Sequence, residues 1–192
     1  MTILESMYPK RDFFENLNHV LDFQINDLNR CSNLAPFLVA VGCMNTIEFL
    51  GGIRNGELGR QGKVESRFRE GVRLLSGKDG VRLLSDLTKA ADEDTMWALR
   101  NGLTHQYLPK VKNIGTIFIG TGGTPGTKYD SVGKVEREEG GIAVKGPYIM
   151  VDIVTLIRAI EEGRKKLMDE LRVDEHKRLR ALEALSRLPE LL

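Results

Sequence analysis

The chain has 192 residues and a mass of 21.5 kDa, enough for one domain with a sizeable core that needs no disulfides. Hydrophobic residues make up 41% of the sequence and charged residues 29%, a composition that excludes wholesale disorder. The formal net charge of +1 argues against non-specific binding along duplex DNA, although it is compatible with a local basic groove. We therefore expect a single domain over residues 1–192 with no duplex DNA partner.

The first two predicted elements are helices. Apolar residues recur at helical spacing over 11–28, and a long apolar stretch follows in which Pro36 falls where the first turn of a helix tolerates proline. This second stretch is apolar on most sides, and Asn45 and Glu48 interrupt it. We expect a buried central helix over 35–53 rather than a membrane span, and no membrane partner.

The next segments alternate between glycine-rich and helical sequence. Residues 51–62 carry five glycines and several charges, which predicts a loop or a frayed helix end. A helix is expected over 64–75, where the motif GVRLLS begins at Gly71; the motif recurs at 80–85. An offset of nine residues is not a whole number of α-helical turns, so we expect two helical segments with a bend. Acidic residues at 92–94 then start a helix that ends before the proline at position 109.

The sequence period changes after that helix. β-Branched residues flanked by glycine predict two strands, at 113–120 and 142–151, which we expect to form a β-hairpin inserted at about 112–151. Amphipathic helices are predicted at 152–172 and 176–188. The sum is a mainly α fold: a helical bundle of five to six helices with a two-stranded β-hairpin insertion before the C-terminal helices.

Cysteine usage and the absence of nucleotide motifs limit the possible cofactors. Cys31 and Cys43 form no CxxC motif and have no neighbouring histidine, so we expect no metal site and a reducing, cytoplasmic setting. The N-terminal segment lacks the apolar core of a signal peptide. The glycine-rich loop 120–126 does not have the residue order of a P-loop, and a hairpin loop is the simpler interpretation. No cofactor is expected.

The most informative local feature is the segment 99–105, with the sequence LRNGLTH. Arg100 offers a guanidinium that binds phosphate oxygens and stays charged, and His105 offers an imidazole that titrates near neutral pH. On a regular α-helix these two positions point roughly 140° apart, whereas Asn101 and His105 are neighbours. The pair therefore converges only if Gly102 loosens the turn or a second subunit completes the site.

An Arg, a polar residue and a His after a four-residue gap, in a late helix of a small bundle, resemble the HEPN superfamily, whose active members are metal-independent ribonucleases. The resemblance covers the motif and the helical order from Asn33 to Tyr107, and the strand insertion departs from a minimal HEPN bundle. It implies a homodimer that joins two motifs over one RNA groove. His105 would handle a proton on the ribose 2′-hydroxyl or the leaving oxygen, Arg100 would stabilise the phosphate, and Asn101 would position one of them. It also implies defence or toxin–antitoxin biology, with an antitoxin or other protein partner.

Three further residues bear on this expectation. Lys110 and Lys112 follow the motif helix and are expected to bind RNA. Glu48 lies within the apolar helix, where a buried carboxylate needs a partner, so either it pairs with an Arg such as Arg100 and supports the site, or it emerges at an exposed helix edge.

Two alternatives to a nuclease stay open. The first is a catalytically inactive HEPN-like bundle that binds RNA, a nucleotide or a protein. The second is a structural protein in which His105 only contacts the last carbonyls of its helix and Arg100 is a solvated residue.

Overall fold

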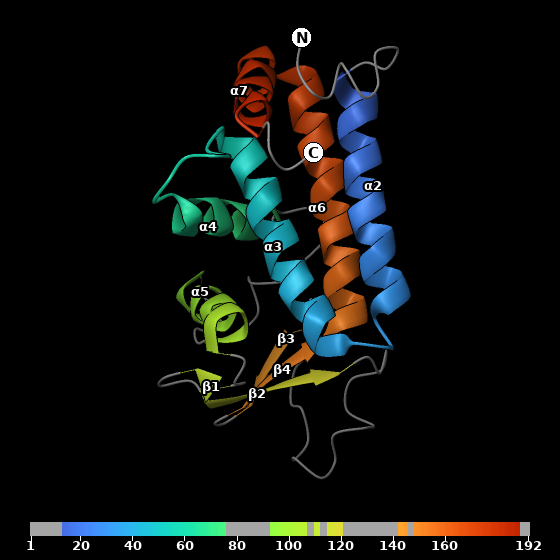
Figure 1. Ribbon diagram of the computed structural model, residues 1–192, viewed down its shortest axis with the longest axis vertical. Helices are drawn as coiled ribbons and strands as arrows, with labels where there is room; N and C mark the ends of the chain where they lie inside the picture. Colours follow the sequence, from blue (N-terminus) through green and yellow to red (C-terminus); the bar gives the residue numbers. More distant parts are fainter. Residues whose placement is uncertain are drawn as a thin grey trace.

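The computed structural model describes the chain in six stretches, and the statements below concern these residues. They are 13–75, 93–106, 110–111, 115–120, 142–145 and 148–188. Over these stretches the chain forms six α-helices, one short π-helix and four strands, so the mainly α prediction is confirmed (Figure 1). The second GVRLLS copy with its expected bend, Lys112 and residues 121–126 of the glycine-rich loop lie outside them.

The helices follow the predicted order. In chain order they are α2 (Phe13–Cys31), α3 (Pro36–Asn55), α4 (Val64–Leu75), α5 (Glu93–Asn101), η1, the π-helix (Gly102–Gln106), α6 (Ile153–Val173) and α7 (Glu175–Ser186). In Figure 1 the long helices α2, α3 and α6 run alongside one another, α4 crosses α3, and α5 lies below α4. The predicted bounds are met within a few residues, and those of α4 agree at both ends.

Helix α3 is the centre of the bundle and contacts α2, α4, α6 and α7. By length and composition it is the one helix in the described stretches that could cross a membrane, a test that the core helix of a soluble protein also passes. Here most of its apolar residues are buried against the surrounding helices, as expected for a central helix, whereas Leu38 is exposed. The buried ones are Val39, Ala40, Cys43, Met44, Ile47, Leu50 and Ile53.

The crossing of α3 and α4 depends on two glycines that let the helix backbones touch. A Cβ added at Gly51 would lie 2.9 Å from the Cα of Gly71, and one added at Gly71 would lie 2.8 Å from the carbonyl carbon of Ile47. The segment 51–62, expected to be a loop or a frayed helix end, divides into the last turn of α3 and a loop, and α3 extends two residues beyond the predicted end at 53. Gly56 ends the helix with a φ of 74°, a left-handed conformation that glycine adopts readily.

An ion-pair network joins four helices at the C-terminal end of α3. The Arg54 guanidinium donates to Glu170 on α6 at 2.8 and 2.9 Å and to Glu70 on α4 at 3.0 Å, and Lys177 on α7 also donates to Glu170 at 3.0 Å. Burial alone would raise the pKa of Glu170, but the hydrogen bonds and charges of Arg54 and Lys177 outweigh it and hold the pKa below its ordinary value. The network fixes α4, α6 and α7 around the end of α3.

The described strands form a four-stranded sheet in the order β1-β2-β4-β3. They are β1 (Lys110–Val111), β2 (Gly115–Gly120), β3 (Ile142–Lys145) and β4 (Tyr148–Asp152). The predicted two-stranded hairpin is not confirmed, because β2 and β4 pair in parallel while β1–β2 and β3–β4 are antiparallel. Parallel strands need a long connection, which the stretch between β2 and β4 supplies. In Figure 1 the sheet lies at one end of the bundle.

The two cysteines differ in environment, which gives a first prediction. Cys43 is fully buried in α3, and burial raises the pKa of its thiol to about 12, whereas Cys31 is exposed. Because the thiolate is the reactive form, Cys31 should react with a thiol reagent at pH 8 while Cys43 stays unmodified. In a titration with an aromatic disulfide, each reactive cysteine releases one equivalent of aromatic thiolate. The native protein should release one equivalent, and the protein unfolded in guanidinium chloride should release two. Rapid release of two equivalents without denaturant would contradict this.

Candidate functional site

The candidate site is built around one carboxylate that binds two guanidinium groups from different helices. Glu48 on α3 accepts from Arg100 on α5, with Oε2 and Nη2 2.9 Å apart. It also accepts from Arg67 on α4, with Oε1 2.7 Å from Nη2 and 3.1 Å from Nε. The three side chains, here called the Glu48 cluster, are only 11–15% exposed. Of the two alternatives that the sequence left open for Glu48, the structure shows the pairing with Arg100.

The glycine crossing explains how sequence-distant residues meet in the Glu48 cluster. Glu48 lies three residues before Gly51 on α3, and Arg67 lies four residues before Gly71 on α4. Positions three and four apart share one face of a helix, so each charged residue is one turn from the glycine contact and on the same side. The close approach of the two backbones thus brings Arg67 within hydrogen-bond distance of Glu48.

In the Glu48 cluster, two guanidiniums bind one carboxylate in a largely dry setting. Low solvent exposure strengthens the interaction of a guanidinium with an anion, compared with the same group on an open surface. Guanidiniums also bind phosphate oxygens well, and Arg100 is the member of the cluster that belongs to the LRNGLTH motif.

Local contacts further fix Arg100. Its Nη1 lies 3.3 Å from Oδ1 of Asn101 and 3.4 Å from Oγ1 of Thr104, and its guanidinium carbon lies 5.4 Å from the centre of the Trp97 ring. The Thr104 hydroxyl in turn donates to the Arg100 carbonyl oxygen at 2.8 Å. The Trp97 ring packs on Phe68 of α4 with 5.9 Å between ring centres. The guanidinium is thus held between a carboxylate, an aromatic face and two side-chain oxygens.

The backbone after Arg100 changes its helical period. Helix α5 ends at Asn101, and η1 begins at Gly102, the glycine that we expected from the sequence to be able to loosen the helical turn. A π-helix closes with bonds between residues five apart, and such segments are frequent at functional sites. Positions 100 and 105 are five apart, so they are closer to one full turn in this geometry than in an α-helix. The backbone thereby reduces the angular separation that a regular helix would impose.

Of the predicted site residues, Glu48, Arg100 and Asn101 lie together. His105 lies in η1 and Lys110 lies in β1, while Lys112 lies outside the described residues. The sequence analysis did not identify Arg67 as a member of the site, because its partner lies on another helix. Thr104 was also missed, although its position four residues after Arg100 was the available signal.

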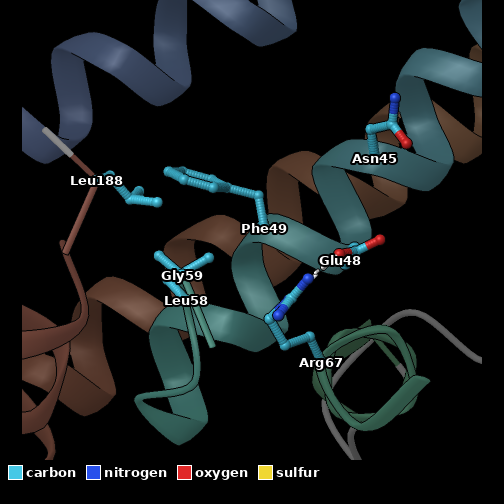
Figure 2. A pocket seen from close by; sticks show the side chains of 7 residues that line it. All are labelled: Asn45, Glu48, Phe49, Leu58, Gly59, Arg67 and Leu188. Carbon is cyan, nitrogen blue, oxygen red and sulfur yellow. Dashed lines mark hydrogen bonds and ion pairs between the residues drawn. The ribbon is translucent and has the colours of Figure 1, made fainter. Parts of the chain in front are cut away.

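A cavity of about 310 Å³ adjoins the Glu48 cluster (Figure 2). The residues that line it come from α3, the α3–α4 loop, α4 and the segment that follows α7. They are Asn45, Glu48, Phe49, Leu58, Gly59, Arg67 and Leu188.

In the described stretches no group of three or more His, Cys, Asp or Glu side chains is arranged to hold a metal ion.

Comparisons with models of known protein families, with curated proteins and with solved structures find no match.

Proposed function

We propose that the protein is a HEPN-like, metal-independent endoribonuclease. The observation that carries the proposal is the Glu48 cluster: the Arg100 guanidinium is held in a mostly buried ion cluster, and the π-helix that follows Arg100 contains His105. The resemblance of LRNGLTH to the superfamily motif supplies the reaction class. A buried ion cluster around the motif arginine favours a positioned side chain over a solvated one.

The proposed reaction uses the RNA itself as the source of the nucleophile. His105 takes the proton of the ribose 2′-hydroxyl, the 2′-oxygen attacks the phosphorus, and the bond from phosphorus to the 5′-oxygen breaks. The departing oxygen takes up a proton, which leaves a 2′,3′-cyclic phosphate and a 5′-hydroxyl end. Arg100 stabilises the charge on the phosphoryl oxygens, and Glu48 and Asn101 position Arg100.

The proposal includes a homodimer in which two motifs face one RNA groove, with Lys110 and Lys112 along the RNA backbone. A phosphate contact from each lysine would make binding depend on salt concentration. A cytoplasmic defence or toxin–antitoxin role, with an antitoxin or other protein partner, belongs to the same proposal.

The test is cleavage of a fluorescent single-stranded RNA in the presence of EDTA. We expect the natural protein to cut it, and His105→Ala to lower kcat/KM by about 100-fold or more, the usual size of a general acid–base contribution. Arg100→Ala should lower kcat/KM by about 100- to 1000-fold. Arg100→Lys, which keeps the charge, should also lower kcat/KM while the fold stays intact.

Controls separate the site from contamination and unfolding. Arg73→Ala changes an arginine on α4 that is 56% exposed and lies outside the Glu48 cluster, so it should cleave RNA like the natural protein. All variants are purified in parallel, and their thermal unfolding is compared by circular dichroism. Unchanged cleavage by folded His105→Ala protein would contradict the proposal.

The second candidate is an inactive binding module of the same fold. It is favoured by the same ion pair, since a guanidinium held by Glu48 can also serve as a scaffold for a bound phosphate. This candidate predicts that the protein binds the fluorescent RNA and forms no cleavage product, whether or not the RNA carries a 2′-deoxy substitution.

A further inference from the structure

The cavity beside the Glu48 cluster has two kinds of wall. Phe49, Leu58 and Leu188 supply apolar surface, and Figure 2 shows the Phe49 ring reaching from α3 towards Leu188. Asn45 and Glu48 add polar groups to the lining. Asn45 shares a face of α3 with Phe49, which lies four residues later, and is also a neighbour of Glu48, which lies three residues later. An apolar cleft with a few placed polar groups is the usual form of a small-ligand site.

The wall of the cavity that faces α4 is fixed by Arg67. Its Nη1 donates to the backbone oxygens of Arg60 at 2.9 Å and Glu57 at 3.3 Å, which hold the loop that contributes Leu58 and Gly59. The same guanidinium binds Glu48. The loop, α4 and α3 are thus joined by one side chain, and the cavity is pre-formed rather than dependent on a mobile loop.

The cavity is adjacent to the proposed reaction centre. Glu48 lines the cavity, and its Oε2 atom lies 2.9 Å from Nη2 of Arg100. A ligand in the cavity is therefore one side chain away from the cation that is proposed to bind the phosphate. This separation suits two parts of one nucleotide, a base and a phosphate.

We propose that this cavity binds a nucleobase of the RNA substrate, next to the phosphate that Arg100 binds; the inference rests on the proposed function and specifies its substrate site. A base offers a flat ring that stacks on Phe49 and an edge that hydrogen-bonds to the Asn45 amide and the Glu48 carboxylate. The largely apolar lining disfavours a bare phosphate, which needs charged or polar partners on several sides. The volume of about 310 Å³ is at the lower end of the range of small-ligand pockets, roughly 300–1,000 Å³, as a single base requires.

The experiment is an NMR titration of the full chain with the four nucleoside 5′-monophosphates, and separately with inorganic phosphate. At least one nucleotide should shift the Leu58 and Gly59 backbone amides and the Asn45 side-chain amide, while inorganic phosphate should leave these three signals in place. Phe49→Leu and Asn45→Ala should weaken nucleotide binding about fivefold or more, the size expected for loss of a stacking partner. Both positions are at most partly buried, so both variants should fold.

A matched control and a kinetic measurement complete the test. Phe23→Leu changes a phenylalanine on α2 that is 64% exposed and should leave nucleotide binding unchanged. In RNA cleavage, Phe49→Leu should raise KM with little change in kcat, because a base contact made equally in the ground and transition states affects only binding.

The outcomes distinguish this proposal from the function it rests on. Nucleotide binding at these amides without RNA cleavage would support the base site and contradict the nuclease. RNA cleavage with unchanged KM in Phe49→Leu, and no nucleotide-dependent shifts, would overturn the base site and leave the nuclease standing. Shifts of the same amides that follow protein concentration instead of nucleotide would mean that a second copy of the chain covers the cavity, and would also overturn it.

Discussion

Glu48→Ala should destabilise the protein by about 3–5 kcal/mol, the cost of removing one partner from a buried ion pair. The substitution leaves Arg67 and Arg100, each with about nine-tenths of its side chain covered, facing each other without the carboxylate that binds both. For a chain of this length the loss corresponds to a fall in the melting temperature of about 6–20 °C, measured by circular dichroism. Glu48→Gln keeps one acceptor oxygen and the packing, so its effect should have the same sign and a smaller size.

A surface ion pair provides the control for Glu48. Glu162 pairs with Lys165 at 2.6 Å, but both side chains are more than half exposed, so Glu162→Ala should cost less than about 1 kcal/mol. An equal loss in the free energy of unfolding for the two alanine variants would show that the Glu48 cluster stabilises the fold no more than an exposed ion pair does. That result would contradict the role of Glu48 in positioning Arg100.

Gly71→Ala should have a comparable effect through packing. The added Cβ would lie 2.8 Å from the carbonyl carbon of Ile47 and 2.9 Å from its Cγ2, so α3 and α4 must move apart. Overpacking of this kind costs about 1–3 kcal/mol and sometimes more, which exceeds the gain of up to about 1 kcal/mol from replacing a helical glycine by alanine. We expect a net loss of stability by chemical denaturation and, because Arg67 moves with α4, weaker RNA cleavage as well.

The matched control for Gly71 is a glycine in another helix that meets only a side chain. A Cβ at Gly163 would lie 2.8 Å from Cδ1 of Leu75, the flexible end of its side chain, which can rotate away. Gly163→Ala should therefore change the free energy of unfolding by less than about 1 kcal/mol. Similar destabilisation by both substitutions would argue against a backbone contact at the α3–α4 crossing.

The helices could be predicted from the sequence because each carries its own signal. Apolar periodicity placed α4 at both ends and α6 within one residue, and the run of apolar residues on most sides of α3 predicted its central position. The pairing of Glu48 was one of two alternatives that the sequence offered, because a buried carboxylate in such a helix needs a partner and an exposed one does not. These are local patterns that do not depend on how the elements pack.

The remaining features depend on contacts between distant segments. The partnership of Arg67 with Glu48 requires the crossing of two helices. Of the two glycines that permit it, Gly51 lies in the segment predicted as a loop or a frayed helix end, and Gly71 lies inside a predicted helix without indicating what it contacts. The parallel pairing of β2 with β4 likewise depends on which strands meet, whereas the sequence pattern marks only where strands occur. The π-helix after Arg100 had one local signal, Gly102, which indicates a loosened turn without specifying its type.

The glycine contact between α3 and α4 has a consequence for how the site fluctuates. Binding residues carried on loops can detach through local opening events that leave the rest of the fold intact. Here Glu48 and Arg67 each stand one turn from a backbone contact at the centre of the bundle, so their separation requires the two helices to come apart. The backbone amides of Glu48 and Arg67 should therefore exchange their hydrogens with solvent only as fast as the whole molecule unfolds, so the contact between these two side chains should last as long as the native state.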